Sequence, residues 1–340
     1  ERSPVLGEVG KEPNPKSEIR NLKFSSWPAD APDQQLSTDK GPEIDPIGVQ
    51  RDVANTAGVK IATSRAGWYR VTKPELQAAG LDTKEAALLQ LYANGREVAI
   101  RVSGNNDEFT DADYVEFYGQ GLDSPTDAAQ TYYLVVGKSA GKRLGAVDSN
   151  ILKPSGPHSF AYTVERRERM IYFSGLLNGD DENFFGQIVS TTASSSAMPV
   201  SNLDPASTAA GTPAQLEVAL QGVTKQAHLV QVTLNGTDLG TMSFANTAHP
   251  QQSFAVPASA LHDGDNTVQL TSLGGAADIS LIDTLRLTYD HAFVADNNAL
   301  SFSLSTQETR RVTGFTNQNI RAVDLTDPLN TMELKPEVKE

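Results

Sequence analysis

An acidic loop at residues 105–113 (NNDEFTDAD) contains the side chains best suited to chemistry in this sequence. Asn105, Asp107, Asp111 and Asp113 stand at odd positions of the loop, so their oxygen atoms could converge. Calcium takes about six to eight oxygen ligands from carboxylates, amides and carbonyls, often within one tight loop. These four residues predict a calcium site, although the central glycine and terminal glutamate of an EF-hand are missing. The alternative is a solvated acidic turn held by its own Asp and Asn side chains.

A second pattern is GKSAG at residues 137–141, which has the G-x-S-x-G spacing of a nucleophile elbow. That chemistry needs the serine on a sharp turn between a strand and a helix, beside an oxyanion hole. The preceding TYYLVV predicts a strand, but KRLGAVDSN after the motif has no helical apolar period. We therefore interpret the motif as a glycine-rich turn, and a hydrolase that uses Ser139 is a remote alternative.

The sequence has five histidines and no cysteine. None of the histidines has a spacing typical of zinc sites, and we interpret His228 and His262 as ordinary surface residues. Without cysteine, the chain has no disulfide, no thiolate metal ligand and no cysteine nucleophile. We expect no enzymatic activity of its own and no cofactor other than calcium.

The formal net charge is -14 over 340 residues. A nucleic-acid-binding protein needs a cationic face, and the one dense basic run is ERRER at residues 165–169, so we expect no nucleic acid partner. No segment approaches the roughly 18 consecutive apolar residues of a transmembrane helix, which predicts a protein that is not membrane-embedded. The sequence begins with Glu1 rather than methionine, so we expect a processed bacterial chain whose signal peptide has been removed.

The predicted fold is mainly β, a small β-rich domain followed by a jelly-roll-like β-sandwich of the carbohydrate-binding-module type. In the first domain, KPELQAA at residues 73–79 predicts a short helix with Thr72 as N-cap, and Asn94-Gly95 predicts a hairpin turn. The predicted segments are an extended, partly disordered leader at 1–58, the small domain at 59–145, a linker at 146–159, the sandwich at 160–294, and a β-strand extension with a polar tail at 295–340.

The sandwich prediction is based on short alternating segments between turn signals in residues 228–293. Asn235-Gly236 is typical of a two-residue hairpin turn, and Asp263-Gly264-Asp265 marks another. We interpret the small, polar stretch 191–212 as a surface loop. Sugars stack on exposed aromatic rings, and both tryptophans lie outside this domain, which weakens a glycan-binding role.

Three blocks resemble the region that precedes the catalytic domain in gingipain-like cysteine peptidases and their secretion-linked relatives. They are GWYRVTKPELQAAGLD with LQLYANGREVAIRV, DADYVEFYGQGLDSP and TYYLVVG; VTLNGTDLG with FAVPASALHDGDNTVQL and IDTLRLTYDHAF; and VTGFTNQNIRAVDLTDP. The resemblance covers about residues 59–328. It implies a small β-domain, a sandwich and a strand leading toward a peptidase domain, but it carries over no catalytic residue.

The resemblance implies a non-catalytic, exported accessory or pro-region that docks to a peptidase domain or neighbouring subunits, in the extracellular space or at the cell surface. The alternative function is a cell-surface adhesin or self-assembling structural protein whose sandwich binds glycan or protein. One observation distinguishes these two functions, namely whether the open reading frame continues past Glu340 into a domain with a Cys/His pair.

Overall fold

The computed structural model describes residues 4–8, 18–21, 45–104, 108–147, 154, 156–177, 182–304 and 308–339. Within these ranges the chain is mainly β, which confirms the predicted fold class. The chain divides into two compact units, one formed by Glu1–Asn150 with Asn319–Glu340 and the other by Ile151–Gln318. No helix in the described ranges is long and apolar enough to cross a membrane.

The first unit contains three β-sheets and short helices. The sheet orders are β2-β3-β9-β5-β6, β4-β8-β7 and β10-β24-β23-β1. The elements are β1 (Pro4–Glu8), β2 (Glu18–Asn21), α1 (Pro46–Ala54), β3 (Gly58–Thr63), β4 (Gly67–Thr72), α2 (Lys73–Ala78), the 3₁₀ helix η1 (Ala86–Leu88), β5 (Leu89–Ala93), β6 (Arg96–Val98), β7 (Arg101–Val102), β8 (Tyr114–Gly119), β9 (Gln130–Val136), β10 (Gly145–Val147), β23 (Ile320–Asp324), the 3₁₀ helix η3 (Pro328–Asn330) and β24 (Met332–Leu334).

Local sequence signals account for the turns and helix starts of this unit. The backbone amide and hydroxyl of Thr72 both donate to the Glu75 carboxylate, which forms a capping box at the start of α2. Asn94 and Gly95 both have positive φ, which confirms the predicted hairpin turn between β5 and β6. A side chain at Gly95 would also meet the carbonyl oxygen of Pro46, so only glycine fits there.

Three elements, β1, β2 and α1, lie inside the stretch 1–58 that the sequence assigns to a leader. The helix α1 begins at Pro46, and the carboxylate of Asp45 accepts a hydrogen bond from the Ile47 amide at 3.1 Å. An Asp N-cap followed by proline is a helix-start signal, so this helix could have been predicted. Residues 1–3, 9–17 and 22–44 lie outside the described ranges.

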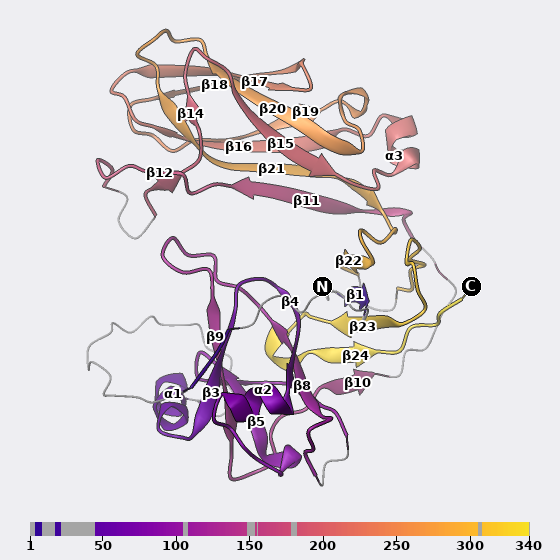
Figure 1. The fold of residues 1–340 in the computed structure, drawn as a ribbon. Coiled ribbons are helices and arrows are strands. Elements are labelled where there is room, and N and C mark those ends of the chain that lie inside the picture. Colours follow the sequence, from indigo (N-terminus) through magenta and orange to yellow (C-terminus); the bar gives the residue numbers. More distant parts are fainter. Residues whose placement is uncertain are drawn as a thin grey trace. The chain divides into compact units, whose positions relative to one another are not determined.

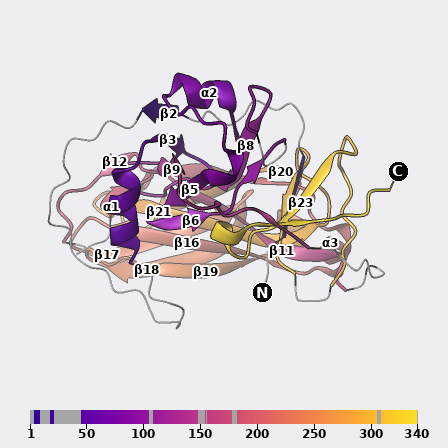
Figure 2. The same ribbon diagram turned by 90° about the horizontal axis from the view of Figure 1, so that it is seen from below.

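The C-terminal segment returns to the first unit, whereas the sequence placed it in an extension after the sandwich. Strand β24 pairs in parallel with β10 and antiparallel with β23. The carbonyl oxygen of Leu329 accepts a hydrogen bond from the Ala99 amide at 3.0 Å. β23 therefore lies among the elements of the first unit although it is nearly the last strand in the chain (Figure 1 and Figure 2). Pairing with a strand distant in sequence leaves no local signal, so the sequence could not reveal it.

The second unit is a sandwich of two antiparallel sheets, with strand orders β11-β21-β16-β19 and β15-β20-β17-β18 (Figure 1). Alternate side chains of both sheets form one apolar core between them. The elements are β11 (Ser159–Arg167), β12 (Ile171–Tyr172), β13 (Phe184–Phe185), β14 (Ile188–Val189), β15 (Ser194–Val200), α3 (Pro205–Ala210), β16 (Ala214–Gly222), β17 (Ala227–Leu234), β18 (Thr237–Ala245), β19 (Gln251–Val256), the 3₁₀ helix η2 (Ala258–Ala260), β20 (Gly264–Ser272), β21 (Ser280–Ala292) and β22 (Ala299–Ser301).

The predicted surface loop at residues 191–212 is wrong. Strand β15 occupies part of this stretch and pairs along its whole length with β20. Its inward residues are Ser194, Ser196, Met198 and Val200, which are all buried. Two of these four are serines, so the apolar alternation that identifies a half-buried strand is weak here. Asp204 then caps α3 by accepting a hydrogen bond from the Ser207 amide at 3.0 Å.

Candidate functional site

The acidic loop is only partly described. Asn105 and Asp107 lie outside the described residues, and the structure places Asp111 and Asp113. The carboxylate of Asp113 accepts hydrogen bonds from the Ser103 hydroxyl at 2.9 Å and from the Thr110 amide and hydroxyl at 2.8 and 2.7 Å. Asp111 is exposed and lies 3.5 Å from the ammonium group of Lys73. In the described part of the chain no three acidic or histidine side chains form a metal-ion cluster.

These contacts give Asp113 a structural role. Hydrogen bonds from the hydroxyl and amide of Thr110, followed by that from the hydroxyl of Ser103, hold the pKa of Asp113 below its usual value. The backbone carbonyl of Asp113 also accepts from the Lys73 amide at 2.9 Å, which joins the end of the loop to the start of α2. Both described carboxylates thus already have partners within the protein, and the calcium site stays a prediction.

Saturating calcium is expected to raise the melting temperature above its value in excess chelator if the loop binds the ion. A ligand that binds only the folded state adds about 2.7 kcal/mol at roughly a hundredfold excess over its Kd. Asp111→Asn is expected to remove most of this increase, because the exposed carboxylate is the one that can turn toward an ion. Glu85→Gln, an equal charge change at an exposed position outside the loop, should retain it. An unchanged midpoint in calcium would contradict the site.

The GKSAG motif forms a turn that follows β9. The amides of Gly137 and Gly141 donate to the carbonyl oxygens of Leu88 and Ala87 at 2.8 and 2.9 Å, so the turn packs on η1. Ser139 is exposed, and the residues after the motif lead through a short irregular segment into strand β10 rather than into a helix. The geometry required of a nucleophile elbow is therefore missing at Ser139.

His228 is buried, so its interpretation as a surface residue is wrong, whereas His262 is exposed as predicted. The His228 Nδ1 atom lies 2.5 Å from the Asp278 carboxylate, and Nε2 lies 2.9 Å from the Asn246 carbonyl oxygen. The other Asp278 oxygen accepts from the Ser272 hydroxyl at 2.7 Å. Both ring nitrogens thus face acceptors inside the protein. The serine contacts the aspartate rather than the imidazole, so this trio lacks the arrangement of a nucleophilic triad.

A second buried histidine, His291, lies in an aromatic environment at the end of β21. Its Nε2 atom lies 2.9 Å from the Asp296 carboxylate, which also accepts from the Asn202 amide group at 2.6 Å. The rings of Phe160 and Tyr162 lie 5.1 and 5.0 Å from its own ring. Because both ring nitrogens of His291 have internal partners, Asp296 and the Ala292 carbonyl oxygen, we assign it a structural role.

A buried and heavily charged region lies in the first unit, around Glu116. The Glu116 carboxylate is 5% exposed and accepts from Arg70 at 2.7 and 2.9 Å and from Arg321 at 3.1 Å. Arg321 also donates to Glu333, and its guanidinium lies 4.0 Å from the centroid of the Trp68 ring. This network joins β8 and β4 to the returning strands β23 and β24.

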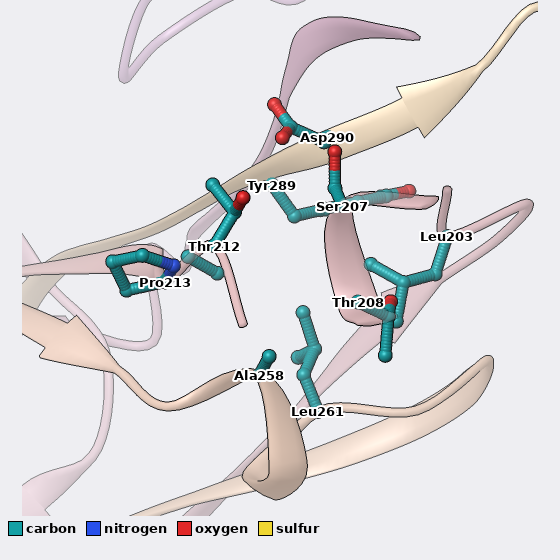
Figure 3. A pocket seen from close by; sticks show the side chains of 10 residues that line it. Leu203, Ser207, Thr208, Thr212, Pro213, Ala258, Leu261, Tyr289 and Asp290 are labelled. Carbon is teal, nitrogen blue, oxygen red and sulfur yellow. The ribbon is translucent and has the colours of Figure 1, made fainter. Parts of the chain in front are cut away.

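A small pocket opens at one end of the sandwich, beside α3 (Figure 3). Its volume is about 20 Å³. Apolar side chains and polar side chains both line it. The lining residues are Leu203, Ser207, Thr208, Thr212, Pro213, Ala214, Ala258, Leu261, Tyr289 and Asp290.

Sequence reasoning missed this pocket because most of its polar residues belong to the stretch 191–212, which was interpreted as a loop. One signal could have located α3, namely the pair Asp204-Pro205, which is typical of an N-cap followed by the first helical position. Asp290 belongs to strand β21 and is half-buried, between the buried residues Tyr289 and His291.

No family model matches this sequence, and no match is found among curated proteins. Among solved structures, dimeric latent PorU from Porphyromonas gingivalis is similar, with a TM-score of 0.62 and 11% identity over 87% of this chain and 31% of that chain. This chain thus spans about a third of that protein, and the similarity shows a shared fold and a distant structural relationship.

Two carbohydrate-binding modules are similar to part of this chain. The CBM36-1 domain of a multidomain xylanase from the hindgut metagenome of Trinervitermes trinervoides has a TM-score of 0.25 and 10% identity over 38% of this chain and 96% of that one. A family 35 module from Clostridium thermocellum has a TM-score of 0.23 and 14% identity over 38% of this chain and 90% of that one.

Proposed function

We propose that this chain is a non-catalytic, exported accessory region of a gingipain-like peptidase, and that it acts as a docking or scaffold module outside the cell or at its surface. The observation that carries the proposal is the similarity in fold to part of latent PorU, which extends over 87% of this chain and 31% of that one. Peptidases of the resembled family use a catalytic cysteine, and this sequence has none. Peptidase activity would therefore belong to another domain or another protein.

The described residues suit a scaffold because each unit has its own extensive core. The ion pairs around Glu116 and Arg321 fix the C-terminal strands on the first unit. A surface carried by such rigid elements loses little conformational entropy when a partner docks on it. This supports a role in which the chain presents fixed surfaces to a peptidase domain.

The first test is the open reading frame beyond the codon for Glu340. A following domain with a Cys/His pair supports the proposal, and that domain can then be purified and titrated with the present chain. We expect saturable binding and a change in the hydrolysis of a chromogenic peptide. Papain, a cysteine peptidase of different fold, is the control and should be unaffected. The proposal would be refuted if no domain with a Cys/His pair follows Glu340 and no peptidase binds to this chain.

A second candidate function, glycan binding, is favoured by one observation on the β12–β13 pair. The Tyr172 side chain is 60% exposed, and its ring centroid lies 5.0 Å from that of Phe184. Exposed rings of this kind can stack on the apolar face of a sugar. If a neutral polysaccharide in the gel retards the chain, Tyr172→Ala should therefore abolish that retardation. The peptidase titration should be unchanged by the same substitution.

A further inference from the structure

The pocket beside α3 has an apolar side and a polar side. Figure 3 shows Ala258 and Leu261 on one side, and Asp290, Ser207 and Thr212 across from them. Ala258 and Leu261 come from the η2 turn and the residue that follows it, whereas the three polar residues come from β21, α3 and the residues after α3. The remaining apolar lining residues are Leu203, Pro213 and Ala214, which flank α3 in the sequence. The pocket thus combines a surface that can contact methylene groups with oxygen atoms that can accept hydrogen bonds.

The carboxylate of Asp290 has no hydrogen bond or ion pair within the part of the chain that the structure describes. The main-chain carbonyl of Asp290 accepts from the Asp204 amide at 2.9 Å, but this contact leaves the side chain free. The one other acidic residue of the same strand, Asp283, is paired and lies 3.0 Å from His249. Asp290 therefore borders the pocket and has no positive partner among the described residues.

The size of the pocket limits what can enter it. A volume of about 20 Å³ is slightly more than the roughly 10–15 Å³ that one water molecule needs by the same measure. Sites for drug-sized ligands usually measure about 300–1,000 Å³. A sugar ring is thus too large, whereas the slender end of an unbranched chain can fit.

We propose that this pocket binds the alkylammonium end of a lysine side chain from a partner polypeptide. The methylene groups would contact Leu261 and Ala258, and the ammonium group would donate to the Asp290 carboxylate and to the hydroxyls of Ser207 and Thr212. Lysine carries a compact charge with three donors on a flexible stem, whereas the planar guanidinium of arginine needs more width. The net charge of -14 adds a general attraction for cationic partners.

The test is an NMR titration of the full chain with N-acetyl-lysine-N-methylamide as the probe. We expect saturable shifts confined to pocket residues, and an affinity reduced roughly fivefold by Asp290→Asn, as for loss of a partly exposed charge pair. Glu85→Gln removes the same charge from an exposed position of the first unit and should leave the affinity unchanged. Ala258→Leu fills the pocket and should abolish the shifts, while a wild-type melting temperature verifies that this variant is folded.

Four results would overturn the proposal. Chemical shifts that do not saturate would show only a general attraction of cations. The same conclusion would follow if Glu85→Gln weakened binding as much as Asp290→Asn does. Equal binding of the norleucine analogue would show an apolar site that ignores the charge. Tighter binding of the arginine analogue would exclude selection for lysine. Binding of 1,5-diaminopentane more than tenfold tighter than the lysine derivative would identify a free amine, rather than a polypeptide, as the ligand.

Discussion

Replacement of Glu116 by glutamine is expected to lower the free energy of unfolding of the first unit by about 3–5 kcal/mol. The substitution preserves the size of the side chain but removes the charge that balances two guanidinium groups. Arg321 is 8% exposed, so little water can replace the lost partner, and Glu333 remains as its other acidic contact. Removing one member of a buried ion pair is costly because the remaining charge stays in a low-dielectric environment.

Urea unfolding of the wild-type chain and of Glu116→Gln measures this difference. The matched control is Glu165→Gln, which makes the same chemical change in the Glu165–Arg286 pair of the sandwich. Both members of that pair are well exposed, with an N–O distance of 2.6 Å. An exposed pair contributes about 0–1 kcal/mol, so the control should be nearly wild-type. Equal losses of unfolding free energy in Glu116→Gln and Glu165→Gln would mean that burial does not increase the contribution of Glu116 to stability.

The same substitution should also loosen β23, because Arg321 lies on that strand and connects it to β8. Amide hydrogen exchange at Ala322 and Val323 is therefore expected to accelerate more than exchange at the core of β9. Local opening of one strand ahead of the whole unit is the usual behaviour of a segment that has lost its main attachment. Exchange that accelerates equally throughout the unit would instead indicate global destabilisation alone.

The sequence predicted those parts of the fold that are encoded locally. Asn94-Gly95 and Asn235-Gly236 form the expected hairpin turns, because asparagine and glycine both accept positive φ. The helix after Thr72 follows from its capping box. Such signals depend on residues a few positions apart, so they can be read without knowledge of the tertiary structure.

Long-range pairing was not predictable in the same way. Glu116 and Arg321 are 205 positions apart, and His228 and Asp278 are 50 apart. Any of the 28 basic and 42 acidic residues could be proposed as partners, and nothing local selects the pairs that are buried together. The same distinction applies to the candidate sites. The acidic loop is a local pattern that the sequence shows directly, whereas the pocket beside α3 forms only when β21 and the η2 turn are brought together in the fold.

Replacement of Asp278 by asparagine is expected to destabilise the sandwich by about 3–5 kcal/mol at pH 7. The Asp278 side chain is fully buried and contacts donors only, namely His228, Ser272 and the amides of Leu229 and Gly274. Asparagine would turn an amide group toward some of these donors and leave them without an acceptor. Urea unfolding at pH 7 measures the loss, and Asp265→Asn at an exposed position of β20 is the control.

The loss of unfolding free energy caused by Asp278→Asn should be smaller at acidic pH. Burial opposes ionisation of Asp278 and on its own raises its pKa, but the hydrogen bonds from Ser272, the Leu229 amide and His228 outweigh it, so the folded-state pKa lies below the usual value. A depressed folded-state pKa contributes stability that is fully present above the unfolded-state pKa of about 3.9 and is lost as the pH falls through the folded-state value. The difference in unfolding free energy between wild-type and Asp278→Asn is therefore expected to be constant from pH 7 to about pH 5 and to narrow below about pH 4. A difference that stays constant down to pH 2 would show that Asp278 takes up its proton at the same pH in the folded and unfolded states, and that its contribution is one of shape rather than charge.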